Sequence, residues 1–337
     1  MKGESKTFSH IPVLLDKFLE ISSPIDGIWV DCTFGAGNFT RGLIEKGAKK
    51  VICIDRDPEI IKNANTLKKK FGNRIHFFNE KFSKIQKITD DLSINQVDGV
   101  VLDIGMSSIQ LENPNRGFSY RHNGPLDMRM SKNGFSAYDI VNKAKLKSLE
   151  DIIFFYGEER NAKRISKNIV KDRDKYRINT TEDLRKIIEK SFQGIKKQTK
   201  KSFYTKTFQA LRIAVNDELN ELIHVLYSIE KILKCGGKFC VISFHSLEDR
   251  IVKNFISKRS KIRQTNRYLP ELEKVLPSFE SLTQKVIIPS QDEIDSNPKS
   301  SSAKMRIAKK ILNKKDYEKN LDLHKISQIK LEWIDTK

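Results

Sequence analysis

The amino-acid sequence predicts an α/β fold, in which a doubly wound, mostly parallel sheet is interrupted by an inserted, mainly helical subdomain. Three observations predict it. Short apolar runs alternate with helical patterns from Ile28 to Val101, a turn rich in glycine follows the first run, and a long stretch then separates Asp103 from the next run of this kind. Alternation of this type is the pattern of βαβ units, whose strands form a parallel sheet.

The first half of the sheet follows from the apolar runs. Four strands are expected, at residues 28–32, 51–54, 75–78 and 97–102. Helical patterns lie between them at Phe39 to Lys46 and at Glu59 to Lys70. Because the runs are continuously apolar instead of alternating with polar residues, we expect both faces of this sheet to be covered by helices.

The inserted subdomain begins where the alternation stops. Turn-forming residues between Asn113 and Pro125 come first, and helical patterns follow at 149–156, 162–171 and 181–191. One long amphipathic helix from Thr207 to Leu233 is expected to lead back to the sheet. The glycine pair Gly236 and Gly237 then ends this connection.

The last part of the chain completes the sheet. A fifth strand is expected at Lys238 to Phe244, and a weaker strand signal follows at Val286 to Pro289. The expected organisation is therefore a first sheet segment, a basic, mainly helical insert, a second sheet segment and a Lys-rich tail, at residues 1–110, 111–205, 206–315 and 316–337.

The charge of the chain points to a polyanionic partner. The formal net charge is +20, and between Val141 and Lys206 there are 19 Lys or Arg against 9 Asp or Glu. Clustered cations gain free energy when they displace the counterions of a nucleic acid. A solvated Lys-rich surface is the alternative, but the concentration of the excess charge in the insert favours a binding patch.

The cysteines and the distribution of apolar residues limit the class of protein to which this chain can belong. The four cysteines lie in or beside apolar runs without C-x-x-C spacing, which predicts reduced core thiols and no metal site. The first nine residues are polar, and no apolar span is long enough to cross a membrane. We therefore expect a cytoplasmic protein without a membrane partner.

Polar residues at the carboxyl ends of the expected strands indicate a cofactor site. Gly35 and Gly37 follow the first strand, where glycine allows the backbone to approach a ligand closely. Asp55 ends the second strand and Asp103 ends the fourth, at the edge where ligands bind in open α/β sheets. The alternative to a cofactor site is that the glycines form an ordinary structural turn and that the two aspartates are unrelated to each other. Thr40 occupies the position of the third glycine of the dinucleotide motif, which disfavours an oxidoreductase.

Two further motifs have both structural and functional interpretations. Asp57 precedes Pro58, which favours an N-cap over a ligand. His245 ends the fifth strand, where it either faces the target base or forms a hydrogen bond to a loop. Ser246 and Asp249 have the spacing of a capping box, with Ser246 as the N-cap.

The ordered motifs of this chain, taken together, resemble those of the MraW/RsmH family of 16S rRNA (cytosine-N4)-methyltransferases. The resemblance extends from His10 to about Ala308, and it rests on these segments: residues 10–15, 31–35, 55–58, 102–110, 116–119, 124–130, 156–160, 207–213, 242–250 and 297–298. It implies a class I methyltransferase fold, Rossmann-like, that uses S-adenosyl-L-methionine. The implied activity is N4-methylation of a cytosine in small-subunit rRNA near the decoding centre.

The resemblance also implies which residues hold the cofactor: Gly37, Asn38, Phe39, Asp55, Phe82, Asp103 and Gln110. The family commonly has Gly-His where this chain has Asn38-Phe39, so contacts at these two positions are expected from the backbone. Phe82 has core packing as its alternative. Asp103 and His245 are the candidate catalytic residues. Many amino-methyltransferases have Pro-Pro after the acidic or amide residue at this position. Here Ile104 and Gly105 follow Asp103, so the mechanism of those enzymes cannot be transferred to this chain.

Other functions remain as alternatives. A non-catalytic ribosome-assembly or RNA-binding factor on the same fold is disfavoured by the intact acidic strand ends, and DNA methylation by the missing Pro-Pro motif. The expected partner is small-subunit rRNA or the assembled 30S subunit. The sequence leaves the oligomeric state open, with a homodimer among the states considered.

Overall fold

The computed structural model describes residues 12–192, 197–261, 276–312 and 331–333, without the side chains of 197–201. The chain forms two compact units, the first made of residues 1–105 and 224–321 and the second of 106–223 and 322–337. The sequence places the corresponding boundaries at 110, 205 and 315. Apart from residues 331–333, the Lys-rich tail expected at 316–337 lies outside the described residues.

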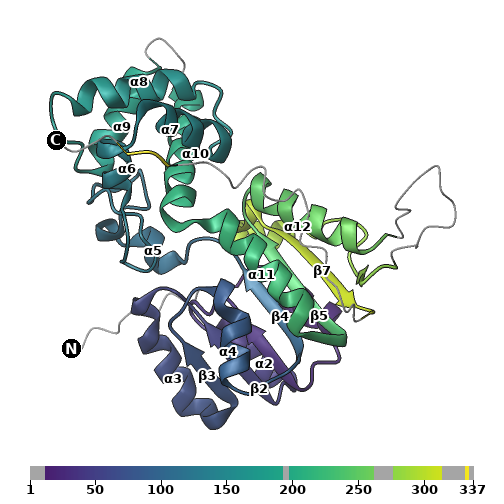
Figure 1. Ribbon diagram of the computed structural model, residues 1–337. Coiled ribbons are helices and arrows are strands. Elements are labelled where there is room, and N and C mark those ends of the chain that lie inside the picture. Colours follow the sequence, from purple (N-terminus) through teal and green to yellow (C-terminus); the bar gives the residue numbers. More distant parts are fainter. Residues whose placement is uncertain (1–11, 193–196, 262–275, 313–330, 334–337) are drawn as a thin grey trace, which may run out of the picture. The chain divides into compact units, whose positions relative to one another are not determined.

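The described part of the first unit contains a seven-stranded sheet in the order β3-β2-β1-β4-β5-β7-β6 (Figure 1). Its strands are β1 Ile28–Asp31, β2 Lys50–Ile54, β3 Ile75–Phe78, β4 Val97–Asp103, β5 Leu233–Ser243, β6 Phe279–Ser281 and β7 Lys304–Lys310. Strands β1 to β5 pair in parallel, and β7 is antiparallel to β5 and to β6. The predicted class I methyltransferase fold is confirmed.

Helices and short 3-10 turns connect these strands. They include α1 Leu15–Ser22, α2 Asn38–Glu45, α3 Ile61–Phe71, α4 Ile85–Asp91, α11 Glu218–Ile232, α12 Ser246–Arg259 and α13 Gln291–Ser296. Helix α2 follows β1 and α3 follows β2, as expected of βαβ units. Phe18 of α1 packs edge-on against both Trp29 and Phe39, so apolar side chains from a helix and from the sheet form one buried core.

Three expectations about the second half of the chain were wrong. The single helix expected from Thr207 to Leu233 is two helices, because Asp217 takes a left-handed conformation with φ 52° and ends α10 (Lys197–Asn216). Gly236 and Gly237 lie within β5, where the pairing with β4 shifts register between Val97 and Gly99.

The third wrong expectation is the strand at 286–289. Ile287 forms only an isolated bridge with Met305, and the edge strand that pairs with β7 opposite β5 is β6, which has three residues. A strand this short carries too little apolar pattern to be recognised from sequence.

The second unit is helical in its described part. Its elements are α5 Ser108–Glu112, α6 Ala137–Lys143, α7 Leu146–Asp151, the π-helical turn η5 Ile152–Tyr156, α8 Ala162–Arg173, α9 Thr181–Lys190 and α10. Residues 331–333 return to this unit, because Lys145 N donates to Glu332 O at 2.8 Å and Trp333 bridges Ala144. None of the described helices of either unit is long and apolar enough to cross a membrane.

Candidate cofactor site

The glycine turn after β1 has two positions whose backbone conformation favours glycine. Gly35 has φ 50° and Gly37 has φ 78°, both in the left-handed region. A Cβ atom on Gly37 would lie 2.8 Å from the Phe34 ring, so a larger residue would also clash. Gly37 is the N-cap of α2 and has no side chain to cap it, which leaves the start of this helix suited to receiving a ligand.

Asp55, directly after β2, holds this turn in place. Its Oδ2 accepts a hydrogen bond from Gly35 N at 2.8 Å, and its Oδ1 accepts one from Asp57 N at 2.9 Å. Burial raises the pKa of Asp55 to about 6. Each carboxylate oxygen can accept a second hydrogen bond, so the same group can also receive ribose hydroxyls. The neighbouring Asp57 accepts from Glu59 N, and its predicted role as an N-cap is confirmed.

Asp31, at the end of β1, accepts hydrogen bonds from residues on both sides of the glycine turn. The side chain is buried, and its Oδ2 accepts a hydrogen bond from Thr40 Oγ1 at 2.7 Å while its Oδ1 accepts one from Thr33 N at 3.2 Å. Burial raises the pKa of Asp31 to about 6. Thr40 therefore has a positive role that the sequence did not reveal, because it was considered only as the replacement of a glycine.

Asp103 ends β4 beside the same turn. Its backbone N donates to Thr33 Oγ1 at 2.7 Å, and register pairs Asp31 with Val101 two residues earlier on β4. Within the described residues, Asp103 Oδ1 is a buried atom with no hydrogen-bond partner. Burial, together with the charges of Asp31 and Glu248, raises the pKa of Asp103 to about 8. A buried acceptor without a partner is costly, which favours a site that a ligand completes.

The segment after β5 was partly misread from sequence. The N-cap of α12 is His245 and not Ser246, and the acid that completes the capping box is Glu248 and not Asp249. His245 Nδ1 accepts from Glu248 N at 3.4 Å, and His245 Nε2 lies 3.0 Å from Glu248 Oε1. Glu248 Oε2 accepts from Phe244 N at 2.9 Å. Both ring nitrogens of His245 thus face Glu248, a fully buried acid that sequence reasoning did not single out.

The remaining candidate residues differ in what their side chains can offer. Phe39 is buried against Phe18, so only its backbone remains for a ligand, as expected from the Asn38-Phe39 departure. Phe82 begins the 3-10 turn after β3 and is only partly buried, so core packing does not account for it fully. Gln110 belongs to the second unit, where it is buried and forms a capping box with Ser107 on α5.

The residues at this sheet edge fit S-adenosylmethionine. The glycine turn provides the close backbone approach, and two acidic strand ends provide acceptors for hydroxyl and amino groups. Acceptors of this kind suit a cofactor that carries hydroxyls and an ammonium group but no phosphates. The glycine turn and the acidic acceptors at this edge are thus consistent with the cofactor that the resemblance implies.

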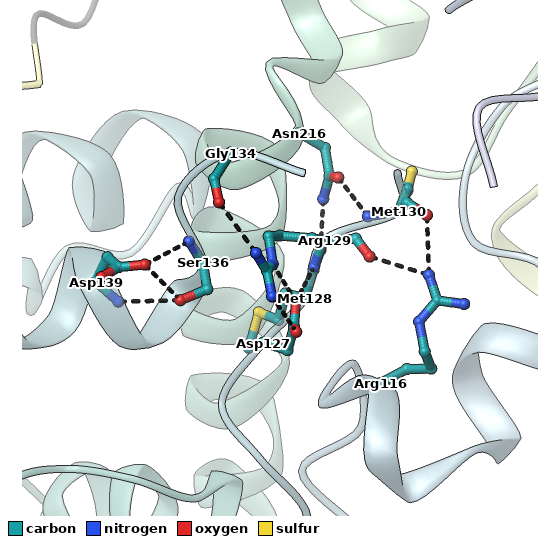
Figure 2. Close-up of polar contacts among 9 residues, drawn as sticks. All are labelled: Arg116, Asp127, Met128, Arg129, Met130, Gly134, Ser136, Asp139 and Asn216. Carbon is teal, nitrogen blue, oxygen red and sulfur yellow. Dashed lines mark hydrogen bonds and ion pairs between the residues drawn. The ribbon is translucent and has the colours of Figure 1, made fainter. Parts of the chain in front are cut away.

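In the second unit, motif residues of the chain form a buried polar framework (Figure 2). Arg116 Nη2 donates to the carbonyl oxygens of Arg129 and Met130, each at 2.9 Å. Asn216 of α10 accepts from Met130 N at 2.9 Å and donates to Met128 O at 2.7 Å. These contacts fix the loop that contains Met128, a buried residue with φ 62°.

The same loop carries an ion pair. Arg129 donates to both carboxylate oxygens of Asp127, at 2.9 and 2.8 Å. Although burial opposes the shift, this pairing holds the pKa of Asp127 below its ordinary value. The motif residues of this loop therefore hold its shape through hydrogen bonds among themselves and with α10 (Figure 2).

The exposed face of α8 carries four of the basic residues of the second unit. Lys163, Arg164, Lys167 and Lys171 are all exposed, and their spacing of three or four residues places them on one side of the helix. No acidic residue stands in the first turn of α8. This is the surface on which the sequence predicts RNA contacts.

Comparisons with known proteins identify the family. A protein of Jannaschia sp. strain CCS1 named ribosomal RNA small subunit methyltransferase H is 46% identical over 309 residues, which cover 91% of this chain and 93% of that protein. A protein of the same name from Roseobacter denitrificans is 45% identical, over 90% of each chain.

Solved structures are less similar. The crystal structure of an rRNA methylase from Streptococcus thermophilus matches with a TM-score of 0.40 and 9% identity, over 88% of this chain and 94% of that one. The model of the MraW methylase family, by contrast, matches residues 7–311. This chain therefore belongs to the MraW methylase family, and it is a methyltransferase.

Proposed function

We propose that this chain transfers a methyl group from S-adenosylmethionine to N4 of a cytosine in 16S rRNA, near the decoding centre. Membership of the methylase family and the names of the relatives support action on small-subunit rRNA. The cytosine, its N4 atom and the decoding centre come from the resemblance of the motifs, and they are the finer part of the proposal.

The observation that carries the proposal is the buried Oδ1 atom of Asp103, which lacks a hydrogen-bond partner among the described residues, at the end of β4. The exocyclic amine of cytosine is a weak nucleophile, because its lone pair is delocalised into the ring. It needs an acceptor that orients one N–H and draws the lone pair toward the methyl group. A carboxylate oxygen without another partner provides that acceptor.

When bound, S-adenosylmethionine supplies an electrophilic methyl group on its sulfonium sulfur. In the reaction the bond from the amine nitrogen to the methyl carbon forms as the bond from that carbon to sulfur breaks, and one proton leaves the amine. We assign to Asp103 the orientation of the amine and the first acceptance of that proton. Because its pKa is about 8 in the free protein, this carboxyl must ionise before it can accept that proton, and the positive sulfonium charge of a bound cofactor would favour the ionised form.

Glu248 and His245 are assigned to the same edge of the sheet. The charge of Glu248 contributes to the raised pKa of Asp103, and His245 lies against Glu248, with Nε2 at 3.0 Å from Oε1 and Nδ1 accepting from the backbone N at 3.4 Å. His245 therefore acts in this proposal as a group that positions Glu248. In this proposal the cofactor is held by the glycine turn, Asp55 and Phe82. Gln110 of the second unit is assigned to the cofactor by the resemblance alone.

The basic face of α8 is assigned to the phosphates of the RNA. Exposed cations there have no acidic partner in the first turn of the helix, so an anionic backbone would neutralise them. The RNA is either free rRNA or the assembled 30S subunit, and the oligomeric state in which the chain acts is not assigned.

Methylation of small-subunit RNA tests the function. Purified 30S subunits and free 16S rRNA from cells that lack this gene would be incubated with the protein and methyl-labelled cofactor, and the modified fragment would be mapped by mass spectrometry. We expect one additional methyl group on a cytosine, released as N4-methylcytidine after digestion. A methyl group on another base, or on the ring carbon or ribose, would contradict the N4 assignment but leave the family intact.

A further inference from the structure

Two phenylalanines of the second unit stand outside its core. Phe154 and Phe155 are each 48% exposed, and their rings form an edge-to-face pair with centroids 5.0 Å apart. They occupy the π-helical turn η5, whose other residues, Ile152, Ile153 and Tyr156, are buried. The three buried residues of this turn pack into the core of the unit, and packing does not account for the two exposed rings.

The turn that follows the rings is held firmly. Glu159 is buried, its N donates to Ile153 O at 3.4 Å, and its Oε1 accepts from Asn161 N at 2.8 Å. Lys206 of α10 donates to Glu158 O at 3.2 Å. A Cβ atom on Gly157 would lie 2.6 Å from Ile153 O, so the backbone here is close-packed. The exposed rings are therefore presented by a well-packed support.

Exposed cations begin five residues after the rings, beyond Glu158 and Glu159. Arg160 is exposed at the end of this turn, and Lys163 and Arg164 are exposed in the first turn of α8. Basic side chains at the start of a helix are opposed by the helix dipole, so they do not serve the stability of α8. An anionic ligand would offset that cost.

We propose that Phe154 and Phe155 form a stacking surface for unpaired bases of RNA, whose phosphates follow the basic face of α8. The inference rests on the proposed action on rRNA and specifies the form of the substrate there: single-stranded nucleotides. Aromatic side chains stack on unpaired bases of any sequence, whereas a base within an A-form duplex is already stacked and its edges are hard to reach.

The charge around the rings selects this ligand over a protein. A docking site for another protein is expected to have an apolar centre without charged residues. Here Lys147 is paired with Asp151 at 2.7 Å and Glu158 is exposed, but on the side of α8 the exposed residues Arg160, Lys163 and Arg164 are all basic. Exposed aromatic rings next to a basic helix face are instead the composition of surfaces that bind single-stranded nucleic acid.

The test compares binding of a short single-stranded RNA with binding of a duplex of the same sequence, by fluorescence anisotropy over a range of salt concentrations and without cofactor. Three double variants at Phe154 and Phe155 are used, to Ala, to Leu and to Tyr. We expect Ala and Leu to weaken single-strand binding about tenfold or more, Tyr to retain it, and all three to change duplex binding less than about twofold. The salt slope should stay at the wild-type value, because no phosphate contact is removed.

Several results would overturn the inference. Single-strand binding by the Ala variant within twofold of wild type would do so, and so would an equal loss for single strand and duplex. Retention by Leu would mean that apolar area and not stacking is recognised. A change of sedimentation coefficient in the Ala variant would identify the rings as a contact between copies of the chain.

The outcome is separable from that of the proposed function. If wild-type protein methylates small-subunit RNA while the Phe variants bind single strands fully, only the stacking surface is refuted. If the stacking pattern appears but wild-type protein transfers no methyl group to rRNA, the surface stands and the proposed reaction fails.

Discussion

Gly35 N donates a hydrogen bond to Asp55 Oδ2 at 2.8 Å, which ties the turn after β1 to the end of β2. One carboxylate thereby has two tasks, because it fixes the glycine turn and remains able to accept ribose hydroxyls. Loss of its charge is expected to affect the ligand more than the fold, whereas loss of the whole side chain affects both.

Asp55→Ala is therefore expected to weaken S-adenosylmethionine binding by about 1.5 to 3 kcal/mol, the range for hydrogen bonds to charged groups. Asp55→Asn is the matched variant, since its amide oxygen can still accept from Gly35 N. Isothermal titration calorimetry gives the dissociation constants, and urea unfolding shows whether each variant is folded. An unchanged dissociation constant in folded Asp55→Ala would remove this residue from the cofactor site.

Charge reversal on α8 tests the basic face. Replacing Lys163, Arg164 and Lys167 together by Glu is expected to weaken RNA binding and to flatten its salt dependence, because phosphate contacts are lost. Cofactor binding should not change. The control reverses three exposed lysines of α3, Lys62, Lys68 and Lys69, which alters the net charge equally. If both triple variants lose RNA affinity to the same extent, the effect comes from overall charge and not from a patch.

The framework of the second unit offers a stability test. Asn216→Ala leaves Met130 N and Met128 O without their partner in a buried environment (Figure 2). We expect a loss of about 1–3 kcal/mol in the free energy of unfolding for each buried group left unpaired. Asn220→Ala, which removes an exposed contact to Asp217, should stay within about 0.5 kcal/mol of wild type. Equal effects of the two variants, measured by urea unfolding, would show that the framework adds no stability.

The sheet was largely predictable because its strands are continuous apolar runs. The four predicted strands at 28–102 match β1 to β4 within one or two residues. The break at Asp217 was not predictable, since the apolar spacing from Phe208 to Leu226 continues across it and a single left-handed residue ends α10. Local backbone conformation of that kind is set by tertiary packing, which periodicity does not report.

The acidic strand ends were predictable for the same reason, because β-strand boundaries place Asp55 and Asp103 at one edge of the sheet. The role of Glu248 was not. It lies inside a segment whose capping pattern can be read in two registers, one residue apart, and only the structure shows that His245 is the N-cap. The effect of this buried acid on Asp103 has no signature in sequence spacing, because the two residues are far apart along the chain and interact only in the fold.

Asp103 should also make stability depend on pH. Its folded pKa of about 8 lies above the ordinary value of 3.8, so between these values the folded protein holds a proton that the unfolded chain releases. Stability therefore falls as pH rises through this window, by at most about 1.4 kcal/mol per pH unit. Asp31 and Asp55, raised to about 6, act in the same direction but at lower pH.

Because Asp103 titrates at higher pH than Asp31 and Asp55, its contribution can be measured separately. Between pH 6.5 and pH 8, wild-type protein without cofactor should lose about 1 to 2 kcal/mol more unfolding free energy than Asp103→Asn, which cannot ionise. Urea unfolding at both pH values measures it. Parallel pH curves for the two proteins would mean that Asp103 titrates below this range in the folded state.

Asp103→Asn is also the decisive variant for catalysis. The asparagine keeps the shape and one acceptor oxygen, and the backbone contact of residue 103 to Thr33 Oγ1 is unaffected. It loses the charge and the capacity to take a proton from the amine. We expect methylation to fall at least about a hundredfold, the contribution that one positioned polar group typically makes. Asp91→Asn, at an exposed acid of α4, serves as the control. Single-turnover methylation of small subunits, with cofactor affinity measured in parallel, separates loss of chemistry from loss of binding. A rate within threefold of wild type would show that Asp103 only supports the sheet edge, and an equal fall in rate and cofactor affinity would assign it to cofactor binding alone.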